Sequence, residues 1–230
     1  MRILIASDAA PPQVNGVVRV FETTADWLRR FGHEVRMIGP GDFARSVPAP
    51  GYPEVRLPVA HGRELARMIE AFRPDSVHIP VVGTLGLAAR HYCRRRGLPF
   101  TTSFHTRFGD YFEKRLGVGS SLAYGFQRWF HNGGTGFMVQ TPTLEAELAE
   151  RGFRNIRRWG RAVDTDLFSP CREEPDFDPE FLALPRPIFL YLGRISPEKN
   201  LEGFLDLDLP GSKVLVGDGP ALGSLKTRYP

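Results

Sequence analysis

The chain has 230 residues, of which 42% are hydrophobic and 24% are charged. This length and composition are enough to bury a sizeable core, which excludes an intrinsically disordered chain and a small disulfide-stapled scaffold. The net charge of +4 permits anionic substrates such as nucleotides. No basic run is interleaved with aromatic residues, so we expect no nucleic acid among the partners of this protein.

The cysteines and the apolar segments bear on where the protein works. The two cysteines are Cys93 and Cys171, and neither has the spacing of a metal ligand or a redox pair. The apolar run near the start, residues 3–6, is too short for a signal-peptide core or a membrane span. We therefore expect free thiols, no metal site and a cytoplasmic location.

Hydrophobic runs of strand length alternate with stretches of helical period in the first part of the chain. In the first of these stretches, Val17, Phe21, Ala25 and Leu28 recur at helical spacing, and Gly32 follows as a terminator. The expected strands are 2–7, 34–39, 76–79, 100–104, 136–140 and 156–159, and the expected helices are 16–31, 63–72, 85–96, part of 108–132 and the turns around 144–148. Proline and glycine are frequent in residues 40–58, which are expected to be connection with one short strand at 55–57.

The alternation also predicts how the chain is divided. Parallel strands need crossover connections, and these are usually helices, so we expect an α/β fold with a parallel sheet. Residues 1–160 are expected to form a Rossmann-like domain, and residues 161–187 a linker. Further strands at 188–193 and 213–217, and helices near 198–205 and after Pro220, are too few to cover a second sheet. Residues 188–230 are therefore expected to be the start of a second, incomplete Rossmann-like domain.

Ligands of open parallel sheets bind at the carboxyl ends of the strands, so the loops there are the first candidates for a site. Asn15 and Gly16 lie between the first strand and the first helix, where free helix amides could hold an anion. The ordinary alternative is that Asn15 only caps the helix. A dinucleotide fingerprint needs three spaced glycines and this loop has Gly16 alone, which disfavours a nicotinamide-dependent oxidoreductase.

His105 follows the strand 100–104 and is the leading candidate for proton transfer, or for a hydrogen bond to a substrate hydroxyl. A structural histidine is an equally good interpretation of the same residue. Arg107 and Asp110, in the same loop, are candidate acceptor-side residues together with Asn15. His78 lies within an apolar run and is expected in the core.

The sequence GRISPEKN brings Arg194 and Lys199 to the end of the strand 188–193, ahead of an expected helix start. An arginine can bind phosphate oxygens with two donors and a lysine adds a mobile point charge, so the pair suits a diphosphate. The alternative is two solvated surface charges. After the next strand, Gly217, Asp218 and Gly219 allow a backbone turn close to a ligand, and they are equally consistent with a plain turn.

Six segments together resemble the retaining glycosyltransferases of the GT-B fold: NGVVR, PDSVHIP, SFHTRF, VDTDLFSP, FLYLGRISPEKNL and VLVGDGP. The resemblance runs along nearly the whole chain. It is greatest to family 4 of these enzymes, particularly to GDP-mannose-dependent alpha-mannosyltransferases and to sulfoquinovosyl and glycolipid transferases. GRISPEKN and VDTDLFSP are its most specific segments.

The resemblance implies two Rossmann-like domains, with the acceptor on the first and the nucleotide sugar mainly on the second. It implies that Gly16 lies near the donor diphosphate, that His105 lies near the transferred sugar, and that Arg194 and Lys199 bind the diphosphate. Asp164 and Asp166 match a segment that enters the second domain. The implied reaction moves a sugar from GDP-mannose or a UDP-sugar to an acceptor hydroxyl with retention, and it needs no metal and no cofactor.

The chain departs from the family pattern after the glycine-rich turn. A further family motif with two glutamates contacts the donor, and this chain stops at Pro230 before it, so we expect a truncated enzyme with weak or absent turnover. Two other interpretations remain open: a nucleotide-sugar epimerase of the same fold, with His105 as its candidate acid or base, and a non-catalytic binding fragment.

The acceptor is expected to be a glycolipid or a saccharide. Phe108, Tyr111, Phe112 and Leu116 recur at helical spacing and could form an amphipathic lip that meets a membrane peripherally. The alternative is that these side chains pack on the core of the domain.

Overall fold

The structure is a computed structural model, and it describes residues 1–49, 52–59, 62–105, 120–160, 163, 165, 168–170 and 179–229. By its internal packing the chain divides into two units, Met1–Ala162 and Val163–Pro230. Several residues singled out in the sequence lie outside the described residues, namely Arg107, Asp110, Asp164, Asp166, Cys171 and the expected lip at 108–116.

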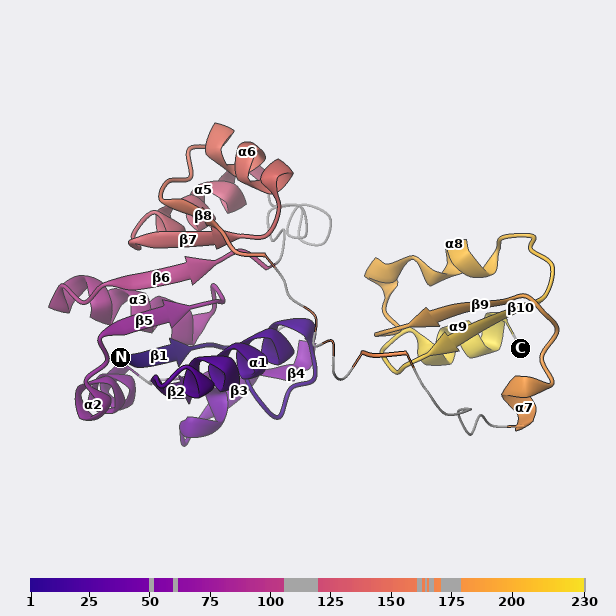
Figure 1. Cartoon of the computed structure of the whole chain (residues 1–230), viewed down its shortest axis with the longest axis horizontal. Helices are drawn as coiled ribbons and strands as arrows, with labels where there is room; N and C mark the ends of the chain where they lie inside the picture. The colour runs from indigo at the N-terminus through magenta and orange to yellow at the C-terminus, as the bar shows by residue number, and fades with distance from the viewer. Residues whose placement is uncertain are drawn as a thin grey trace. The chain divides into compact units, whose positions relative to one another are not determined.

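The first unit contains a six-stranded sheet in which each strand pairs in parallel with its neighbours, as the sequence predicts (Figure 1). The strand order is β2-β1-β5-β6-β7-β8. The strands are β1 (Arg2–Ala6), β2 (Glu34–Ile38), β5 (Ser76–Ile79), β6 (Phe100–Ser103), β7 (Gly136–Val139) and β8 (Ile156–Arg158). The helices in the described part of this unit are α1 (Gly16–Arg30), α2 (Gly62–Phe72), α3 (Thr84–Arg96), α5 (Ser120–His131) and α6 (Pro142–Glu150).

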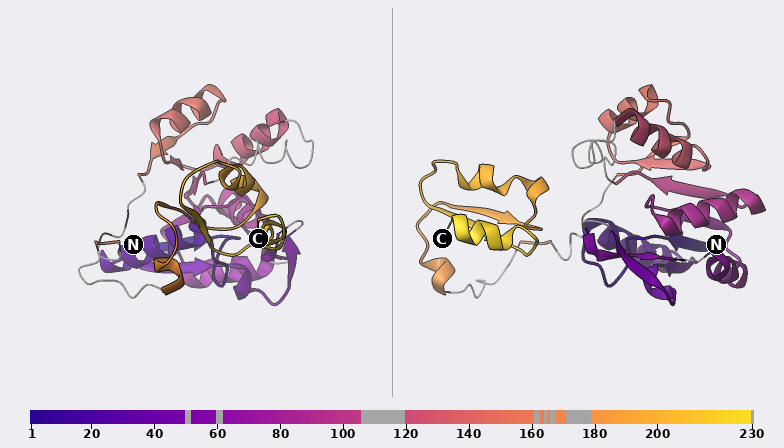
Figure 2. Two further views of the ribbon diagram at one scale, coloured as in Figure 1. Left: turned by 90° about the vertical axis from the view of Figure 1, so that its right-hand side faces the viewer. Right: turned by 180° about the vertical axis from the view of Figure 1, so that it is seen from behind.

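The order of the strands reverses at β1, and this reversal decides which helices cover which face. Because crossovers are right-handed, the helix before the reversal and the helices after it lie on opposite faces. Ile3 and Ile5 of β1 pack in a cluster with α1, whereas Leu4 and Ala6 pack in a cluster with α2, α3 and the end of α5. Figure 2 shows the helices and strands from two further directions. The reversal lies between β1 and β5, where doubly wound sheets bind their ligands.

Residues 40–58 contain more regular structure than the sequence predicts, although the expected strand 55–57 lies within one of the observed strands. They form a 3₁₀ turn η1 (Pro40–Asp42) and an antiparallel hairpin of β3 (Ser46–Ala49) and β4 (Tyr52–Pro58). The prolines of this segment favoured a connecting loop in the sequence prediction, because proline has no N–H to donate a hydrogen bond to a neighbouring strand. A two-stranded sheet tolerates proline because each of its strands has a free edge.

The second unit contains a parallel pair, β9 (Ile188–Leu192) and β10 (Ser212–Val216), and short helices. The helical elements are α7 (Pro179–Leu182), the 3₁₀ turn η2 (Pro197–Lys199), α8 (Leu201–Leu205) and α9 (Leu222–Arg228). Helices α8 and α9 pack their leucines into one cluster with Tyr191 and Leu215. Leu190, Leu192 and Val216, on the alternate positions of the same strands, are exposed.

None of the helices in the described ranges combines the length and the hydrophobicity that crossing a bilayer requires.

Candidate functional site

A row of polar side chains leads to His105 at the carboxyl end of β6. Thr101, Ser103 and His105 occupy alternate positions and so share one face of the sheet, and His78 lies beside Thr101 on the neighbouring strand β5. His78 Nδ1 lies 2.8 Å from Thr101 Oγ1, and His78 Nε2 lies 3.1 Å from Ser103 Oγ. Ser103 Oγ lies in turn 2.8 Å from His105 Nε2. One chain of hydrogen bonds therefore joins the two imidazoles.

Aromatic side chains enclose this pair of imidazoles. The ring of Phe21, on α1, lies 5.1 Å from His78 and 5.3 Å from His105 between centroids. The Trp159 ring lies 6.2 Å from that of His105. Burial, with a smaller contribution from His105, lowers the pKa of His78 to about 3, so His78 is neutral at ordinary pH. His78 is in the core, as predicted, but it is also the hydrogen-bonded support of the candidate residue His105.

Sequence reasoning missed Ser103 and Thr101 as parts of this site. The signal was available, because a buried strand of a parallel sheet is normally apolar on both faces, whereas this one has three consecutive polar residues at 101–103. The partnership with His78 was not available, because it depends on the register between β5 and β6.

Helix α1 begins at Gly16, five residues before Phe21, whose ring contacts both imidazoles. Asn15 caps α1, since its Oδ1 accepts hydrogen bonds from the amides of Val17 and Val18, each at 3.0 Å. A Cβ added to Gly16 would meet no other atom within 4 Å. No contact with the described chain therefore requires glycine at this position. The acceptor-side role of Asn15 and the donor-side role of Gly16 stay predictions.

The point where the strand order reverses is occupied by Asp8, a residue that the sequence did not single out. This carboxylate follows β1, is 2% exposed, and accepts hydrogen bonds from the amides of Leu85 at 2.9 Å and Gly86 at 3.0 Å. It accepts a third, at 3.2 Å, from the hydroxyl of Thr84. The first amides of α3, which could otherwise hold an anion, are thus bound by a carboxylate of the chain itself.

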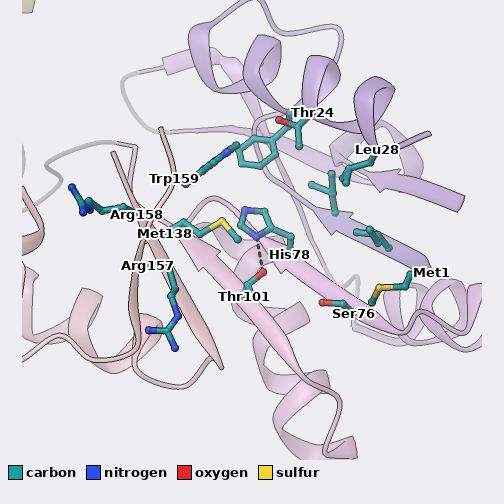
Figure 3. A pocket seen from close by; sticks show the side chains of 13 residues that line it. Met1, Thr24, Leu28, Ser76, His78, Thr101, Met138, Arg157, Arg158 and Trp159 are labelled. Atoms are coloured by element: carbon teal, nitrogen blue, oxygen red, sulfur yellow. Dashed lines mark hydrogen bonds between the residues drawn. The ribbon is translucent and has the colours of Figure 1, made fainter. Parts of the chain in front are cut away.

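A cavity of about 390 Å³ lies between α1 and the sheet (Figure 3). Phe21, His78, Met138 and Trp159 are among its lining side chains, with Arg157 at the side of β8. Met1 and Ser76, from the amino ends of β1 and β5, line it as well, so this cavity extends to the opposite edge from His105. His105, Asn15 and Gly16 do not line it.

In the second unit, the loops after β9 and β10 lie backbone against backbone. The amide of Ile195 donates to the carbonyl of Asp218 at 2.9 Å. A Cβ on Gly217 would lie 1.9 Å from the carbonyl oxygen of Gly193, and a Cβ on Gly219 would lie 2.2 Å from that of Ile195. These two glycines therefore allow the loops of this chain to approach each other, which is the structural interpretation of the glycine-rich turn.

Arg194 and Lys199 both lie exposed after β9, on either side of Glu198. Burial works against the charged form of Glu198, yet its pKa is lowered, because the Ser196 hydroxyl, a backbone amide and the positive charges of Arg194 and Lys199 favour the carboxylate. Both cations therefore stabilise negative charge at the position of the Glu198 carboxylate.

The helix expected near 198–205 begins as predicted at Pro197, but it is not one continuous helix. Lys199 ends the single turn η2, Asn200 takes a left-handed conformation with φ 50°, and α8 has five residues. Helix dipoles of such short elements contribute little, so an anion here depends on the side chains. Among the described residues there is no cluster of three or more potential metal ligands, and Cys93 is a free buried cysteine.

Comparison with known proteins identifies the family. Residues 14–167 match the sequence profile described as Glycosyltransferase Family 4. The chain belongs to this family. Among curated relatives, the family 4 chain is 30% identical to a GDP-mannose-dependent alpha-mannosyltransferase of Mycolicibacterium smegmatis, over 100% of this chain and 66% of the relative. It is 24% identical to the sulfoquinovosyl transferase SQD2 of Arabidopsis thaliana, over 95% of this chain and 47% of the relative. The family 4 chain therefore spans less than two thirds of the length of these relatives.

Two solved structures show the fold of the family 4 chain. The catalytic domain of starch synthase IV from Arabidopsis thaliana, bound to ADP and acarbose, has a TM-score of 0.57 at 14% identity, over 99% of this chain and 71% of that chain. UDP-GlcNAc 2-epimerase from Methanocaldococcus jannaschii has a TM-score of 0.50 at 11% identity, over 90% of this chain and 61% of that chain. The predicted GT-B class is thus confirmed.

Proposed function

We propose that this protein transfers a sugar from a nucleoside diphosphate sugar to an acceptor hydroxyl, with retention of the anomeric configuration. The observation that carries the proposal is the position of the His105 side chain in this family 4 glycosyltransferase chain. Its ring lies at the carboxyl end of β6, hydrogen-bonded to Ser103 and enclosed by Phe21 and Trp159. A ring held in this way can present a hydrogen bond to the transferred sugar without reorganising.

Arg194 and Lys199 supply the second part of the proposed chemistry. Cleavage of the bond between the sugar and the diphosphate leaves negative charge on the phosphate oxygens. Cations that are already in place stabilise this charge more in the transition state than in the ground state. Burial raises the pKa of Glu198, yet the pKa is lowered overall, and the charges of Arg194 and Lys199 contribute to this lowering after the Ser196 hydroxyl and a backbone amide. This supports a local field that favours negative charge. In the proposed reaction these side chains take the part that a divalent metal has in other transferases.

The finer assignments follow the relatives. GDP-mannose is the first donor to test, because the relative from Mycolicibacterium smegmatis is named for it, and UDP-sugars are the second. A lipid-linked or saccharide acceptor is proposed because relatives include a sulfoquinovosyl transferase and an alpha-monoglucosyldiacylglycerol synthase. No cofactor is needed for this chemistry.

The experiment is calorimetric titration of the 230-residue chain with GDP, UDP and GDP-mannose. One nucleotide is expected to bind, and Arg194→Ala is expected to weaken it at least about tenfold, which corresponds to the loss of one charge-assisted contact. Lys226→Ala is the matched control, since Lys226 is another exposed cation of the same unit and lies on α9. Equal weakening by both substitutions, or no binding of any nucleotide, would count against the proposed donor site.

The epimerase of similar fold makes isomerisation the competing activity. An epimerase converts the nucleotide sugar without an acceptor, whereas the proposed transferase needs one. Product analysis with GDP-mannose and UDP-sugars in the absence of acceptor separates the two, because an epimerised sugar would favour isomerisation. A chain that binds a nucleotide and neither transfers nor epimerises would be a binding fragment.

A further inference from the structure

A row of apolar side chains lies exposed along α5, on the side of the helix away from the core. Leu122, Phe126 and Trp129 follow one another at helical spacing, and they are 73%, 45% and 52% exposed. Tyr124, Gln127 and His131, on the other side of α5, are buried. Three large apolar residues in one row, beside a side that already fills the core, indicate an interaction surface. We call these three residues the α5 row.

The α5 row is held in place by contacts with its neighbours. The rings of Phe126 and Trp129 are stacked, with centroids 5.6 Å apart and an interplanar angle of 24°. The guanidinium carbon of Arg90, on α3, lies 3.7 Å from the centroid of the Trp129 ring. Arg90 also donates hydrogen bonds to the carbonyl oxygens of Trp129 at 2.9 Å and Phe130 at 3.1 Å. The arginine-bearing helix α3 therefore borders the aromatic end of the row.

Among the described residues, the helix that forms the α5 row and the helix that borders it carry positive charge. Helices α3 and α5 contain no Asp or Glu, and their charged residues are Arg90, Arg94, Arg95, Arg96 and Arg128. The nearby carboxylate of Glu70 is paired with Arg96. On α6, two of the three glutamates are likewise paired with arginines, at Glu145 and Glu147. An anionic partner would meet positive charge beside the exposed aromatic rings.

We propose that the α5 row and the arginines beside it bind the interface of an anionic lipid bilayer. Tryptophan and phenylalanine are favoured at the level of the lipid headgroups, and arginines near them attract anionic lipids. A second copy of this chain fits less well, because a symmetric contact would bring the same arginines against each other. The proposal goes beyond glycosyl transfer and does not depend on donor binding.

Sedimentation with vesicles tests the proposal without any nucleotide sugar. The 230-residue chain is expected to bind vesicles of phosphatidylcholine mixed with phosphatidylglycerol and to bind pure phosphatidylcholine much more weakly. Arg94→Gln with Arg95→Gln is expected to weaken binding to the anionic vesicles at least about tenfold, since each arginine near the surface contributes about 1 kcal/mol. Leu122→Ser with Phe126→Ser is expected to weaken it by a similar factor.

Matched variants control for other exposed apolar groups. Trp27 lies on α1, with Arg30 over its ring, and Phe31 directly follows the helix. Trp27→Ala with Phe31→Ala is expected to leave binding unchanged, although both side chains are exposed. Leu190→Ser with Leu192→Ser is the same control for the exposed face of β9. All of these positions are exposed, so retained circular dichroism and melting temperature show that a change in binding is not a change in folding.

Fluorescence gives a second measurement that keeps the wild-type surface. Lipids with brominated acyl chains are expected to quench Trp129, so quenching is lost in Trp129→Phe and kept in Trp27→Phe. Four results would overturn the proposal: equal binding to neutral and anionic vesicles, no binding to either, equal loss in the α1 control, or self-association that Leu122→Ser with Phe126→Ser abolishes. Nucleotide titration of the same variants shows separately whether the proposed donor site is intact.

Discussion

His78 and His105 share one hydroxyl group, that of Ser103, which lies 3.1 Å from one Nε2 atom and 2.8 Å from the other. A hydroxyl has one proton to donate, so it can donate to only one of these two nitrogens. The other imidazole must then donate its own Nε2 proton to Ser103. The protonation of the two rings is therefore coupled, although they belong to different strands.

The first prediction concerns this coupling. When His105 takes up a proton, it donates from Nε2 to Ser103, so Ser103 must donate to His78, whose remaining proton is then on Nδ1 toward Thr101. Nitrogen-15 spectra of the imidazoles should show His78 neutral, and in this one tautomer wherever the spectra show His105 protonated. In Ser103→Ala the tautomer of His78 should no longer follow the state of His105. A tautomer that responds equally in both proteins would contradict the coupling.

The second prediction concerns stability against pH. Burial lowers the pKa of both His78 and His131 to about 3, from an ordinary value of 6.5. Between these values the unfolded chain binds protons that the folded chain does not, so the free energy of unfolding should fall as the pH falls. Each histidine should contribute a slope of about 1.4 kcal/mol per pH unit well inside this window.

Denaturant unfolding at a series of pH values measures this slope. His131→Gln should reduce it by about the share of one histidine, while His91→Gln is the control because His91 is exposed on α3. A stability that stays constant from neutral pH down to pH 4 would show that the buried rings accept protons in the folded state.

The third prediction concerns Asp8 and the start of α3. Asp8→Ala removes the acceptor of two buried amides and one hydroxyl, and should lower the free energy of unfolding by roughly 3 kcal/mol. Gly83→Ala should also destabilise, because the new Cβ would lie 2.3 Å from the Asp8 carboxylate. Both changes act on the same contact. The loss of unfolding free energy in the double variant should therefore be clearly smaller than the sum of the losses in the two single variants. Additive losses in chemical unfolding would refute this shared contact.

The fourth prediction separates a structural from a ligand-binding role for Gly16. A Cβ at Gly16 meets no atom within 4 Å, and alanine favours helix more than glycine, so Gly16→Ala should leave stability unchanged or raise it by about 0.5–1 kcal/mol. If the donor approaches this backbone, the same variant should lose nucleotide affinity. Calorimetry of unfolding and of binding on one sample compares the two effects. Unchanged affinity would remove Gly16 from the donor site.

The fifth prediction concerns the glycine-rich turn of the second unit. Gly217→Ala places a Cβ 1.9 Å from a carbonyl oxygen and should disrupt the contact between the loops after β9 and β10. Gly223→Ala, in the adjacent helix α9, meets no atom within 4 Å and should be tolerated. Hydrogen exchange at the amide of Ile195, which donates to Asp218, reports the contact directly. Comparable exchange in both variants would mean that Gly217 is not needed for it.

The sequence by itself determined the elements of this protein and the class of its fold. Apolar spacing predicts α1 because its buried residues recur at 3.6-residue intervals, and strands such as 76–79 are recognised as short apolar runs between helices. The position of His105 at a strand end follows from the same pattern. Local periodicity failed at β3, because the tolerance of proline there depends on a free strand edge that the sequence does not show.

Only the tertiary structure decided which residues meet. The register of β5 against β6 places His78 beside Thr101, and the reversal of strand order brings Asp8 to the amides of Leu85 and Gly86, far along the chain. The backbone contact of Gly217 with Gly193 is of the same kind. Residue spacing predicts the face of an element, whereas contacts between elements depend on their pairing and packing, which are fixed by the whole fold.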